Sequence, residues 1–409
     1  MIRADVTTGN YSNPRTQPDL RLRPRLQTQS PAPAPKRILM TADTVGGVWT
    51  YALDLTRALV EYGVEVSLAT MGAPLSPSQR AEAGAVANLE IFESDYKLEW
   101  MDDPWRDVRK AGEWLRLLEE RIRPDIVHLN GYAHGALDFR APVLMVGHSC
   151  VLSWWRAVLG CPAPAQWNQY RAEVACGLAA ADIVIAPTRA MLGALEHHYG
   201  SIRDGRVVYN GRDASLFEVR VKDEFVITAC RLWDEAKNIG ALSRASSQIL
   251  WPVLVAGDQR SPNGGVDGGV ASTGRLHPLG RLSQRQIAGW FSRAAIYAAP
   301  ARYEPFGLSA LEAGLSGCAL ALGDIPSLRE IWDGAAIFVP PDDVEALRDA
   351  IEELIENPRL RVAYGARARM RAQEFTSQRM AAGYLAAYSD LMTRTDKRAV
   401  AFGGRSVCA

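Results

Sequence analysis

The chain has 409 residues, of which 48% are hydrophobic and 22% are charged, and its 46 Lys and Arg balance its 46 Asp and Glu. This length predicts two or three domains with substantial cores, and the zero net charge argues against a protein that wraps nucleic acid. No run of 18 apolar residues occurs, so we expect no transmembrane segment. The six cysteines are scattered without a C-x-x-C pair, and we therefore expect reduced thiols and a cytoplasmic location.

Residues 1–35 differ in composition from the rest of the chain. They contain six prolines, and five arginines against two aspartates leave them with a net charge of +3. This composition predicts a disordered leader. The positive charge leaves open a peripheral contact with the inner face of a membrane, beside the simpler role of a solvated linker.

From Lys36 onward, short apolar runs alternate with amphipathic stretches. The runs predict buried strands at residues 37–42, 64–70, 125–130, 142–148, 182–187 and 206–210. A second series of strands is predicted at 225–230, 252–257, 295–300, 318–323 and 336–340. Helices are predicted at 48–62, 283–292, 308–317 and 342–356. The alternation indicates parallel βαβ units, and so an α/β fold with two doubly wound domains.

We expect the domains at residues 36–210 and 222–375, with a C-terminal helix over 376–395 that could cross back to the first domain. In open α/β folds, ligands bind at the carboxyl ends of the strands. The functional residues should therefore follow the strands, in a cleft between two facing domains.

The most specific motif follows the predicted strand at 295–300. Gly307 leads into a helix, so the backbone N–H groups of Phe306, Gly307, Leu308 and Ser309 should face the cleft and offer a site for a phosphate or another anion. Glu304 precedes this turn, and Glu312 lies one turn into the helix among small and apolar residues. A carboxylate in such surroundings needs a partner, which could be ligand hydroxyl groups or a neighbouring arginine.

A pair of basic residues follows the strand at 225–230. Arg231 lies at the end of that strand and Lys237 on the next helix, so both could contact a diphosphate. The alternative is that Lys237 is a solvated residue paired with Asp234, three positions earlier.

Three further segments follow strands of the first series. Gly46 and Gly47 would let the backbone approach a ligand, although any turn from strand to helix can carry two glycines. His148 ends the strand at 142–148 and could bind a substrate hydroxyl or transfer a proton. His134 lies just beyond another strand and could line the cleft, whereas His128 should be a core residue.

The sequence does not suggest a metal site. It contains no D-x-D motif, and Asp342 and Asp343 stand where acids cap a helix. Positive side chains and a helix terminus can replace a metal ion beside a diphosphate. We therefore expect no cofactor and no metal requirement.

The E-x7-E motif formed by Glu304 and Glu312, together with Arg231, Lys237 and the glycine pair, resembles the retaining GT-B glycosyltransferases of family 4. The resemblance runs from about Arg37 to about residue 390. It implies two facing Rossmann-like domains and a metal-independent hexosyltransferase of carbohydrate biosynthesis. The co-substrate would be a nucleoside-diphosphate sugar, and the acceptor a hydroxylated glycan, glycolipid or small metabolite.

The resemblance also implies roles for the motif residues. Glu312 would bind the ribose hydroxyls, Glu304 the transferred sugar, and the amides of residues 306–309 the sugar and the diphosphate. Arg231 and Lys237 would neutralise the leaving diphosphate. The remaining donor-side contacts would come from Gly46, Gly47, His148, Arg281 and Leu282, the last two at the base.

Two departures from the family pattern concern sugar specificity. Cys230 replaces the glycine that usually precedes the phosphate-binding arginine, and residues 323–326 read Gly-Asp-Ile-Pro where a glycine pair often stands. On the acceptor side, Trp154 and Trp155 follow His148 closely and are acceptor candidates together with His134, although core packing explains tryptophans equally well.

Two other functions stay open from the sequence. A nucleotide-sugar epimerase of the same shape would need an acid–base set around the sugar, which we do not find. A two-domain binding or regulatory protein would close on its ligand without catalysis, and donor hydrolysis would discriminate it from an enzyme.

Overall fold

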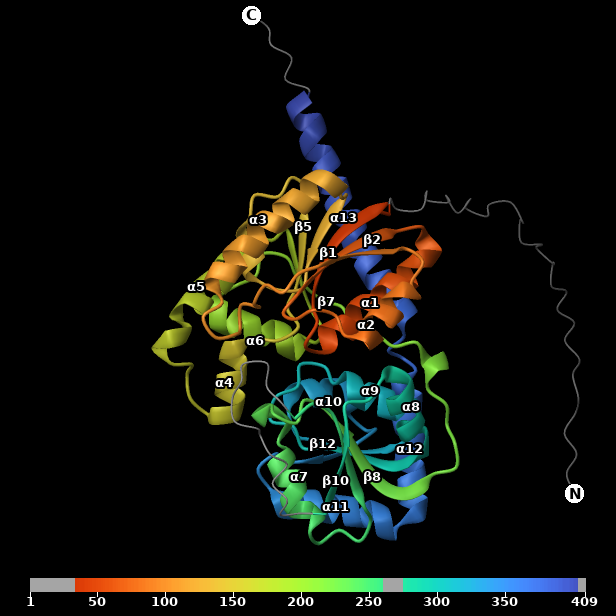
Figure 1. Ribbon diagram of the computed structural model, residues 1–409. Helices are drawn as coiled ribbons and strands as arrows, with labels where there is room; N and C mark the ends of the chain where they lie inside the picture. The colour runs from red at the N-terminus through yellow and green to blue at the C-terminus, as the bar shows by residue number, and fades with distance from the viewer. Residues whose placement is uncertain (1–33, 260–274, 404–409) are drawn as a thin grey trace, which may run out of the picture. The chain divides into compact units, whose positions relative to one another are not determined.

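The computed structural model describes residues 34–259 and 275–403, apart from the side chains of 395–403. The predicted leader at 1–35 falls almost entirely outside the described residues. The described chain forms two parallel sheets, each flanked by helices (Figure 1). We call residues 36–210 together with the last helix, α13 (Ser377–Gly403), the N-terminal lobe, and residues 222–375 the C-terminal lobe.

The N-terminal sheet has seven described strands in the order β3-β2-β1-β4-β5-β6-β7, all parallel. In the register, Met40 pairs with Leu68 on one side and with His128 on the other. The strands are β1 (Arg37–Asp43), β2 (Glu65–Met71), β3 (Leu89–Glu93), β4 (Ile126–Leu129), β5 (Val143–Val146), β6 (Ile183–Ala186) and β7 (Gly205–Val207).

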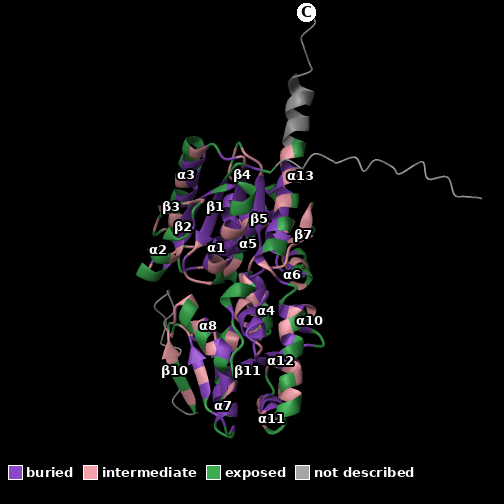
Figure 2. Cartoon of the chain, turned by 90° about the vertical axis from the view of Figure 1, so that its right-hand side faces the viewer, coloured by how far each residue is buried: buried purple, intermediate pink, exposed green. Residues whose placement is uncertain are grey.

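Successive residues of these strands enter two different cores, as expected for a sheet covered on both faces. Ile38 and Met40 pack with α1 and α13 on one face, whereas Leu39 packs with α3 and α5 on the other. Burial is accordingly concentrated in the strands (Figure 2). The helices and 3-10 turns are α1 (Gly47–Leu59), η1 (Val60–Tyr62), α2 (Pro77–Gly84), α3 (Trp105–Ile122), η2 (Ala133–Ala136), α4 (Val151–Leu159), η3 (Ala165–Trp167), α5 (Asn168–Ala180) and α6 (Arg189–Tyr199).

The C-terminal sheet is also parallel, with its described strands in the order β10-β9-β8-β11-β12-β13. Ile227 faces a core shared with α8, α9 and α12, and its neighbour Val226 faces one shared with α7 and α11. The strands are β8 (Asp223–Ala229), β9 (Val253–Ala256), β10 (Leu276–Gly280), β11 (Ala294–Ala299), β12 (Ala319–Gly323) and β13 (Ile337–Val339). The helices and turns are η4 (Ala214–Leu216, before β8), η5 (Glu235–Lys237), α7 (Ile239–Ser246), α8 (Gln284–Arg293), α9 (Leu308–Leu315), α10 (Pro326–Trp332), α11 (Val344–Glu356) and α12 (Pro358–Ala372).

The chain passes between the lobes twice, and the two passages touch each other. The N–H of Arg212 donates to Phe375 O at 3.1 Å, and the N–H of Ser377 donates to Arg212 O at 3.2 Å. A Cβ at Gly211 would lie 2.1 Å from Thr376 O, so only glycine allows this approach. The second passage leads into α13, whose Tyr384 and Tyr388 lie in the core of the N-terminal lobe.

The sequence prediction of an α/β fold with two doubly wound, Rossmann-like domains is confirmed. The prediction omitted the strands β3 and β10. Both lie at sheet edges, where one side of the strand needs no partner, and Glu90, Glu93 and Pro278 interrupt their apolar pattern.

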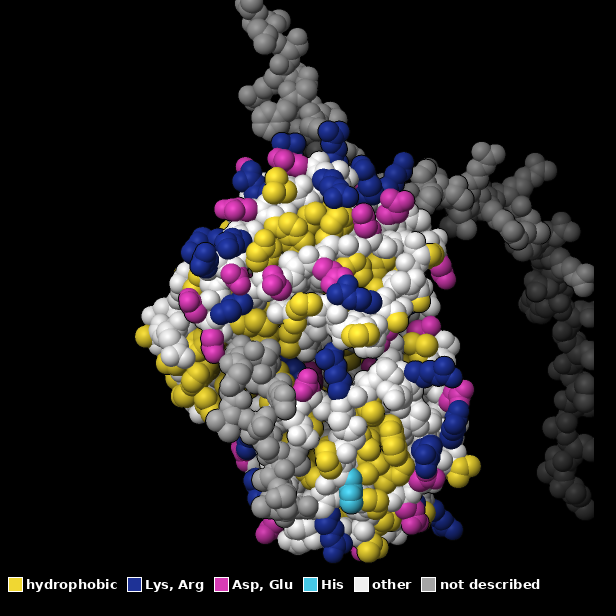
Figure 3. Space-filling model, in the orientation of Figure 1, with side chains coloured by type: hydrophobic (Ala, Val, Ile, Leu, Met, Phe, Trp, Pro, Cys, Tyr) yellow, Lys and Arg dark blue, Asp and Glu magenta, His cyan; other side chains and the backbone are white. Residues whose placement is uncertain are grey.

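No helix in residues 34–259 and 275–403 is long and apolar enough to cross a bilayer. On the face drawn in Figure 3, basic and acidic side chains are interspersed, in keeping with the balanced charge of the sequence.

Candidate active site

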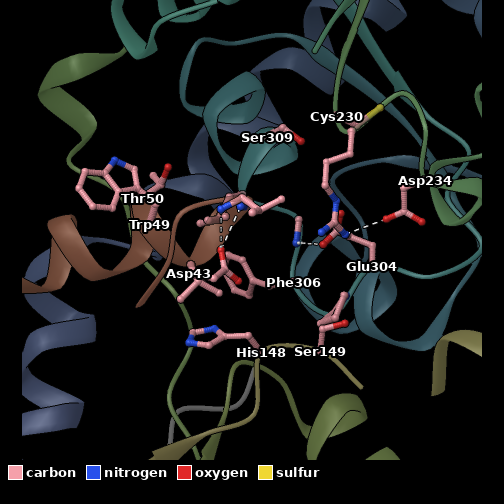
Figure 4. Close-up of a pocket in the computed structure, with 18 of the residues that line it drawn as sticks. Asp43, Trp49, Thr50, His148, Ser149, Cys230, Asp234, Glu304, Phe306 and Ser309 are labelled. Carbon is pink, nitrogen blue, oxygen red and sulfur yellow. Dashed lines mark hydrogen bonds and ion pairs between the residues drawn. The ribbon is translucent and has the colours of Figure 1, made fainter. Parts of the chain in front are cut away.

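A cavity of about 850 Å³ is lined by residues of both lobes, at the carboxyl ends of their strands. Asp43 ends β1, Asn130 and His148 follow β4 and β5, and Cys230 follows β8. Its volume lies within the range of small-molecule sites. Side chains from the two lobes surround this space in Figure 4.

The amino end of α9 forms part of the cavity wall, as the sequence motif predicts. Gly307 precedes the helix with a φ of 91°, a left-handed conformation that favours glycine. Its N–H donates to Glu304 Oε1 at 3.1 Å, and the amides of Leu308 and Ser309 follow in the first turn. The Ser309 hydroxyl is 2.9 Å from Tyr297 Oη, which fixes the position of this side chain at the cavity wall. First-turn amides at the positive end of a helix suit a phosphate.

Glu304 and Lys237 form an ion pair inside the cavity. Lys237 Nζ lies 2.7 Å from Glu304 Oε2, and the two side chains are 13% and 22% exposed. Lys237 belongs to the short η5 turn after β8, so its side chain reaches across 67 residues of sequence to the α9 motif. The structure thus places the predicted cation and carboxylate in direct contact.

Asp234 pairs with Arg231 rather than with Lys237, the partner considered from the sequence. Arg231 Nη2 donates to Asp234 Oδ2 at 2.7 Å, and its guanidinium lies 5.3 Å from the Trp233 ring centroid. Burial by itself raises the pKa of Asp234, but the charges of Arg231 and Lys237 lower it below its ordinary value. Asp234 therefore stays ionised and holds Arg231 at the cavity.

Glu312 is buried at the floor of the same cavity, where Arg212 Nε lies 3.0 Å from its Oε1. From the sequence, the partner of this carboxylate could be ligand hydroxyl groups or a neighbouring arginine. The structure shows an arginine. Burial raises the pKa of Glu312; the charge of Arg212 acts against this rise and the charge of Asp54 adds to it.

The glycine pair of the N-terminal lobe approaches these donor-side residues. Asp43 Oδ1 accepts hydrogen bonds from the N–H groups of Val45 at 3.2 Å and Gly46 at 3.0 Å, which shapes the turn into α1. A Cβ built on Gly46 would lie 3.6 Å from Arg231 Nη1, and one on Gly47 would lie 3.5 Å from Leu308 Cδ1. The turn therefore lies in van der Waals reach of the other lobe.

His148 lies in the cavity with a defined tautomer. Asn130 Nδ2 donates to Thr41 O, which turns its Oδ1 toward His148 Nε2 at 2.8 Å. With a carbonyl oxygen as its partner, Nε2 carries the proton and Nδ1 is left as an acceptor. Burial lowers the pKa of His148 to about 3, so the ring is neutral near pH 7.

The remaining predicted residues divide into two groups. Arg281, Leu282, Trp154 and Trp155 line the cavity. His134 does not, and its assignment to the acceptor side is corrected: it is buried beneath α3, with Nε2 2.9 Å from Val108 O. The turn η2 directs its side chain into the core.

Several cavity residues were not predicted from the sequence. Asp43, Asp234 and Tyr303 belong to this group, and Tyr303 joins the lobes because its hydroxyl accepts the N–H of Cys150 at 3.0 Å. The position of Asp43 in the cavity could have been predicted, since this residue ends the first strand beside the glycine pair. Among residues 34–259 and 275–403, no three His, Cys, Asp or Glu side chains are arranged to hold a metal ion.

Comparison with known proteins identifies the family. Residues 45–216 match the model for Glycosyltransferase Family 4, and residues 223–357 match the model for Glycosyl transferases group 1. The chain belongs to the family 4 glycosyltransferases. The membership predicted from the E-x7-E motif and its companions is confirmed, and the protein is a glycosyltransferase enzyme.

Two relatives of this glycosyltransferase illustrate the likeness. Over 355 residues it is 24% identical to the phosphatidyl-myo-inositol mannosyltransferase of Mycolicibacterium smegmatis, which covers 81% of this chain and 87% of the relative. Over 152 residues it is 35% identical to the D-inositol 3-phosphate glycosyltransferase of an Arthrobacter species, covering 37% of this chain and 33% of the relative.

Solved structures confirm the GT-B fold. Sucrose-phosphate synthase from Thermosynechococcus elongatus has a TM-score of 0.73 at 21% identity, covering 88% of this chain and 100% of that one. HepE of Anabaena, solved in complex with UDP and glucose, has a TM-score of 0.66 at 16% identity, covering 87% and 100%. At such identities the likeness establishes the fold alone.

Proposed function

We propose that this glycosyltransferase moves a hexosyl group from a nucleoside-diphosphate sugar to a hydroxylated acceptor, with retention at the anomeric carbon and without a metal ion. The observation that carries the proposal is the contact of Glu304 with both Lys237 and the amide of Gly307, at the amino end of a helix that faces the cavity. This arrangement sets a cation, a carboxylate and free amides within reach of one sugar diphosphate.

The proposed chemistry begins at the leaving group. As the bond between the anomeric carbon and the diphosphate oxygen breaks, negative charge grows on that oxygen. Arg231, Lys237 and the first-turn amides of α9 are positioned to stabilise this charge, the role that a metal ion has in other transferases. Asp234 and Glu304 hold the two cations beforehand, so little reorganisation is needed when the donor binds.

The sugar would lie between the lobes. Glu304 would accept hydrogen bonds from its hydroxyls, and the unprotonated Nδ1 of His148 would accept another from the opposite side. Because burial keeps His148 neutral, we assign it hydrogen bonding rather than the role of a charged general acid. Glu312 would bind the ribose, with Arg281 and Leu282 at the base.

The acceptor would enter from the N-terminal lobe, near Trp154 and Trp155. Their rings meet edge to face with centroids 6.0 Å apart and offer a surface for a sugar or another partly apolar group. The names of the relatives suggest which compounds to test first: mannosyl donors, and inositol or inositol phosphates as acceptors.

The decisive experiment measures hydrolysis of UDP-glucose, UDP-galactose, ADP-glucose and GDP-mannose by the purified full chain, without acceptor. We expect one donor to be hydrolysed, with unchanged rate in EDTA. Loss of activity in EDTA that Mn²⁺ restores would refute the metal-free mechanism, and binding of a nucleotide sugar without turnover would favour a binding protein.

Retention is tested separately, once a donor and an acceptor are known. The proton NMR spectrum of the first product shows whether the anomeric configuration of the donor is kept. An inverted product would overturn that part of the proposal. Cell fractionation tests the accompanying proposal that the enzyme acts in the cytoplasm, free or at the inner face of the membrane.

A further inference from the structure

A fully buried arginine lies where the two lobes are connected. The side chain of Arg212 is 0% exposed, although arginine is among the residues least often buried. Its backbone pairs with both Phe375 and Ser377 of the returning passage, and its guanidinium lies 5.3 Å from the Phe217 ring centroid. A buried guanidinium is costly unless it is paired, so its partners should indicate its role.

The ion-pair partners of Arg212 are two carboxylates from different lobes. The side-chain amide of Gln284 also contacts its guanidinium, and the charge of the adjacent Asp213 acts on it as well. Asp54 of α1 contacts its Nη1, and Glu312 of α9 lies 3.0 Å from its Nε. The Nε–H is not aligned on the Glu312 oxygen, so this second contact is an ion pair rather than a hydrogen bond. Asp54 in turn pairs with Arg57 at 3.1 Å.

These four side chains form an alternating chain of charges, Arg57–Asp54–Arg212–Glu312. Arg57, Arg212 and Glu312 all line the cavity, although the side chain of Arg212, like that of Asp54, is almost fully buried. Of these four side chains, Glu312 is the one proposed to touch the nucleotide. Its charge and direction therefore depend on a neighbour whose own partner belongs to the other lobe.

We propose that Arg212 is a positioning residue that keeps Glu312 ionised and directed toward the donor, and that Asp54 sets the strength of this hold from the N-terminal lobe. The inference rests on the proposed function, because it takes Glu312 as the carboxylate that binds the ribose. Arg212 itself is not required to touch the ligand.

The proposal predicts that substitutions at Asp54 and at Arg212 have opposite effects on the pH at which Glu312 takes up a proton. Asp54→Asn removes a negative charge, so Arg212 and Arg57 act on Glu312 without competition, and Glu312 should stay ionised to lower pH. Arg212→Lys keeps one charge but loses the planar fork that reaches both carboxylates. Arg212→Met removes the charge, and Glu312 should then take up a proton at higher pH.

The experiment measures the affinity for UDP-glucose and GDP-mannose by calorimetry between pH 5 and 8, on the full chain. As the pH falls, protonation of Glu312 should weaken binding, and we call this fall in affinity the acid limb. We expect the acid limb to move down by about one pH unit in Asp54→Asn and up by about one to three units in Arg212→Met. Arg212→Lys should lie between wild type and Arg212→Met. Glu312→Gln should abolish the limb, because it removes the titrating group.

The control variant is Glu330→Gln. Glu330 also joins the lobes, since it accepts the N–H groups of Arg189 and Ala190 at the start of α6, yet it does not line the cavity. Its substitution should leave the pH profile in place even if stability falls.

The outcomes separate this inference from the proposed function. If wild type binds neither nucleotide sugar, the assignment of the donor fails. If wild type binds but Asp54→Asn follows the wild-type profile, or moves in the same direction as Arg212→Met, the positioning role is overturned. Should Arg212→Met fail to fold, Asp54→Asn and Arg212→Lys still decide the question.

Discussion

The indole N–H of Trp154, on helix α4 of the N-terminal lobe, donates a hydrogen bond to Asp234 Oδ1 of the C-terminal lobe at 3.0 Å. The other oxygen of Asp234 holds Arg231. A residue on the proposed acceptor side thus contacts the carboxylate that orients Arg231, the proposed phosphate-binding cation. This contact connects the proposed acceptor side to the proposed donor side through one hydrogen-bonded path.

Trp154→Phe keeps the aromatic ring but removes the donor. A hydrogen bond to a charged group contributes about 1.5–3 kcal/mol, so we expect kcat/KM to fall roughly 10- to 100-fold with the fold intact. Steady-state kinetics with the donor found in the hydrolysis panel measures this loss. Trp290→Phe is the matched control, because Trp290 packs against Phe225 and does not line the cavity, and an equal loss in both variants would contradict the assignment.

Glu304→Ala should reduce transfer by at least ~10²-fold, roughly 2.7 kcal/mol, because the carboxylate holds Lys237 and is proposed to bind the reacting sugar. The rate of product formation at saturating donor measures the effect. Glu235→Gln is a suitable control, since Glu235 also lines the cavity but is exposed. Near-normal turnover of Glu304→Ala would remove Glu304 from the site.

Gly211→Ala should destabilise the connection between the lobes. The added Cβ would meet Thr376 O, a backbone atom that cannot rotate away, so we expect a loss of about 1–3 kcal/mol in the free energy of unfolding. Gly193→Ala, inside α6, offers the contrasting case, because nothing lies within 4 Å of its new Cβ. Alanine should stabilise that helix slightly. Urea unfolding of the two variants gives both values, and equal stability would contradict the steric argument.

His128 should make the protein less stable in acid. The side chain is fully buried between the hydroxyls of Tyr51 and Tyr388, and burial lowers its pKa to about 3. Because the unfolded chain binds this proton near pH 6.5 and the folded chain does not, the contribution is complete above pH 6.5 and falls as the pH decreases toward 3.

At pH 5 the loss from His128 is roughly 2 kcal/mol relative to pH 7. His128→Asn should therefore lose less stability than wild type between these two pH values, although it is less stable at pH 7. Denaturant unfolding at both values tests this, and parallel losses in the two proteins would show that His128 does not titrate as described.

Several features of this enzyme could be predicted from local sequence. Buried parallel strands require continuous apolar runs, so the positions of most strands along the chain and the two doubly wound domains could be predicted directly. The E-x7-E spacing places Glu304 before a helix and Glu312 one turn inside it, whatever the rest of the chain does. Edge strands such as β3 were not predicted, because a strand at an exposed edge tolerates charged residues and needs no continuous apolar run.

The pairing of charges was decided by the tertiary structure. Glu304 meets Lys237 across 67 residues, and Arg212 meets Asp54 across 158, so no local pattern could show which carboxylate each cation holds. His134 has the same local setting as His148, just after a strand, yet packing against α3 turns it into the core. Sequence determined which residues stand at the strand ends, whereas the meeting of the lobes decided their partners, because a Coulomb interaction depends on distance in space and not on separation along the chain.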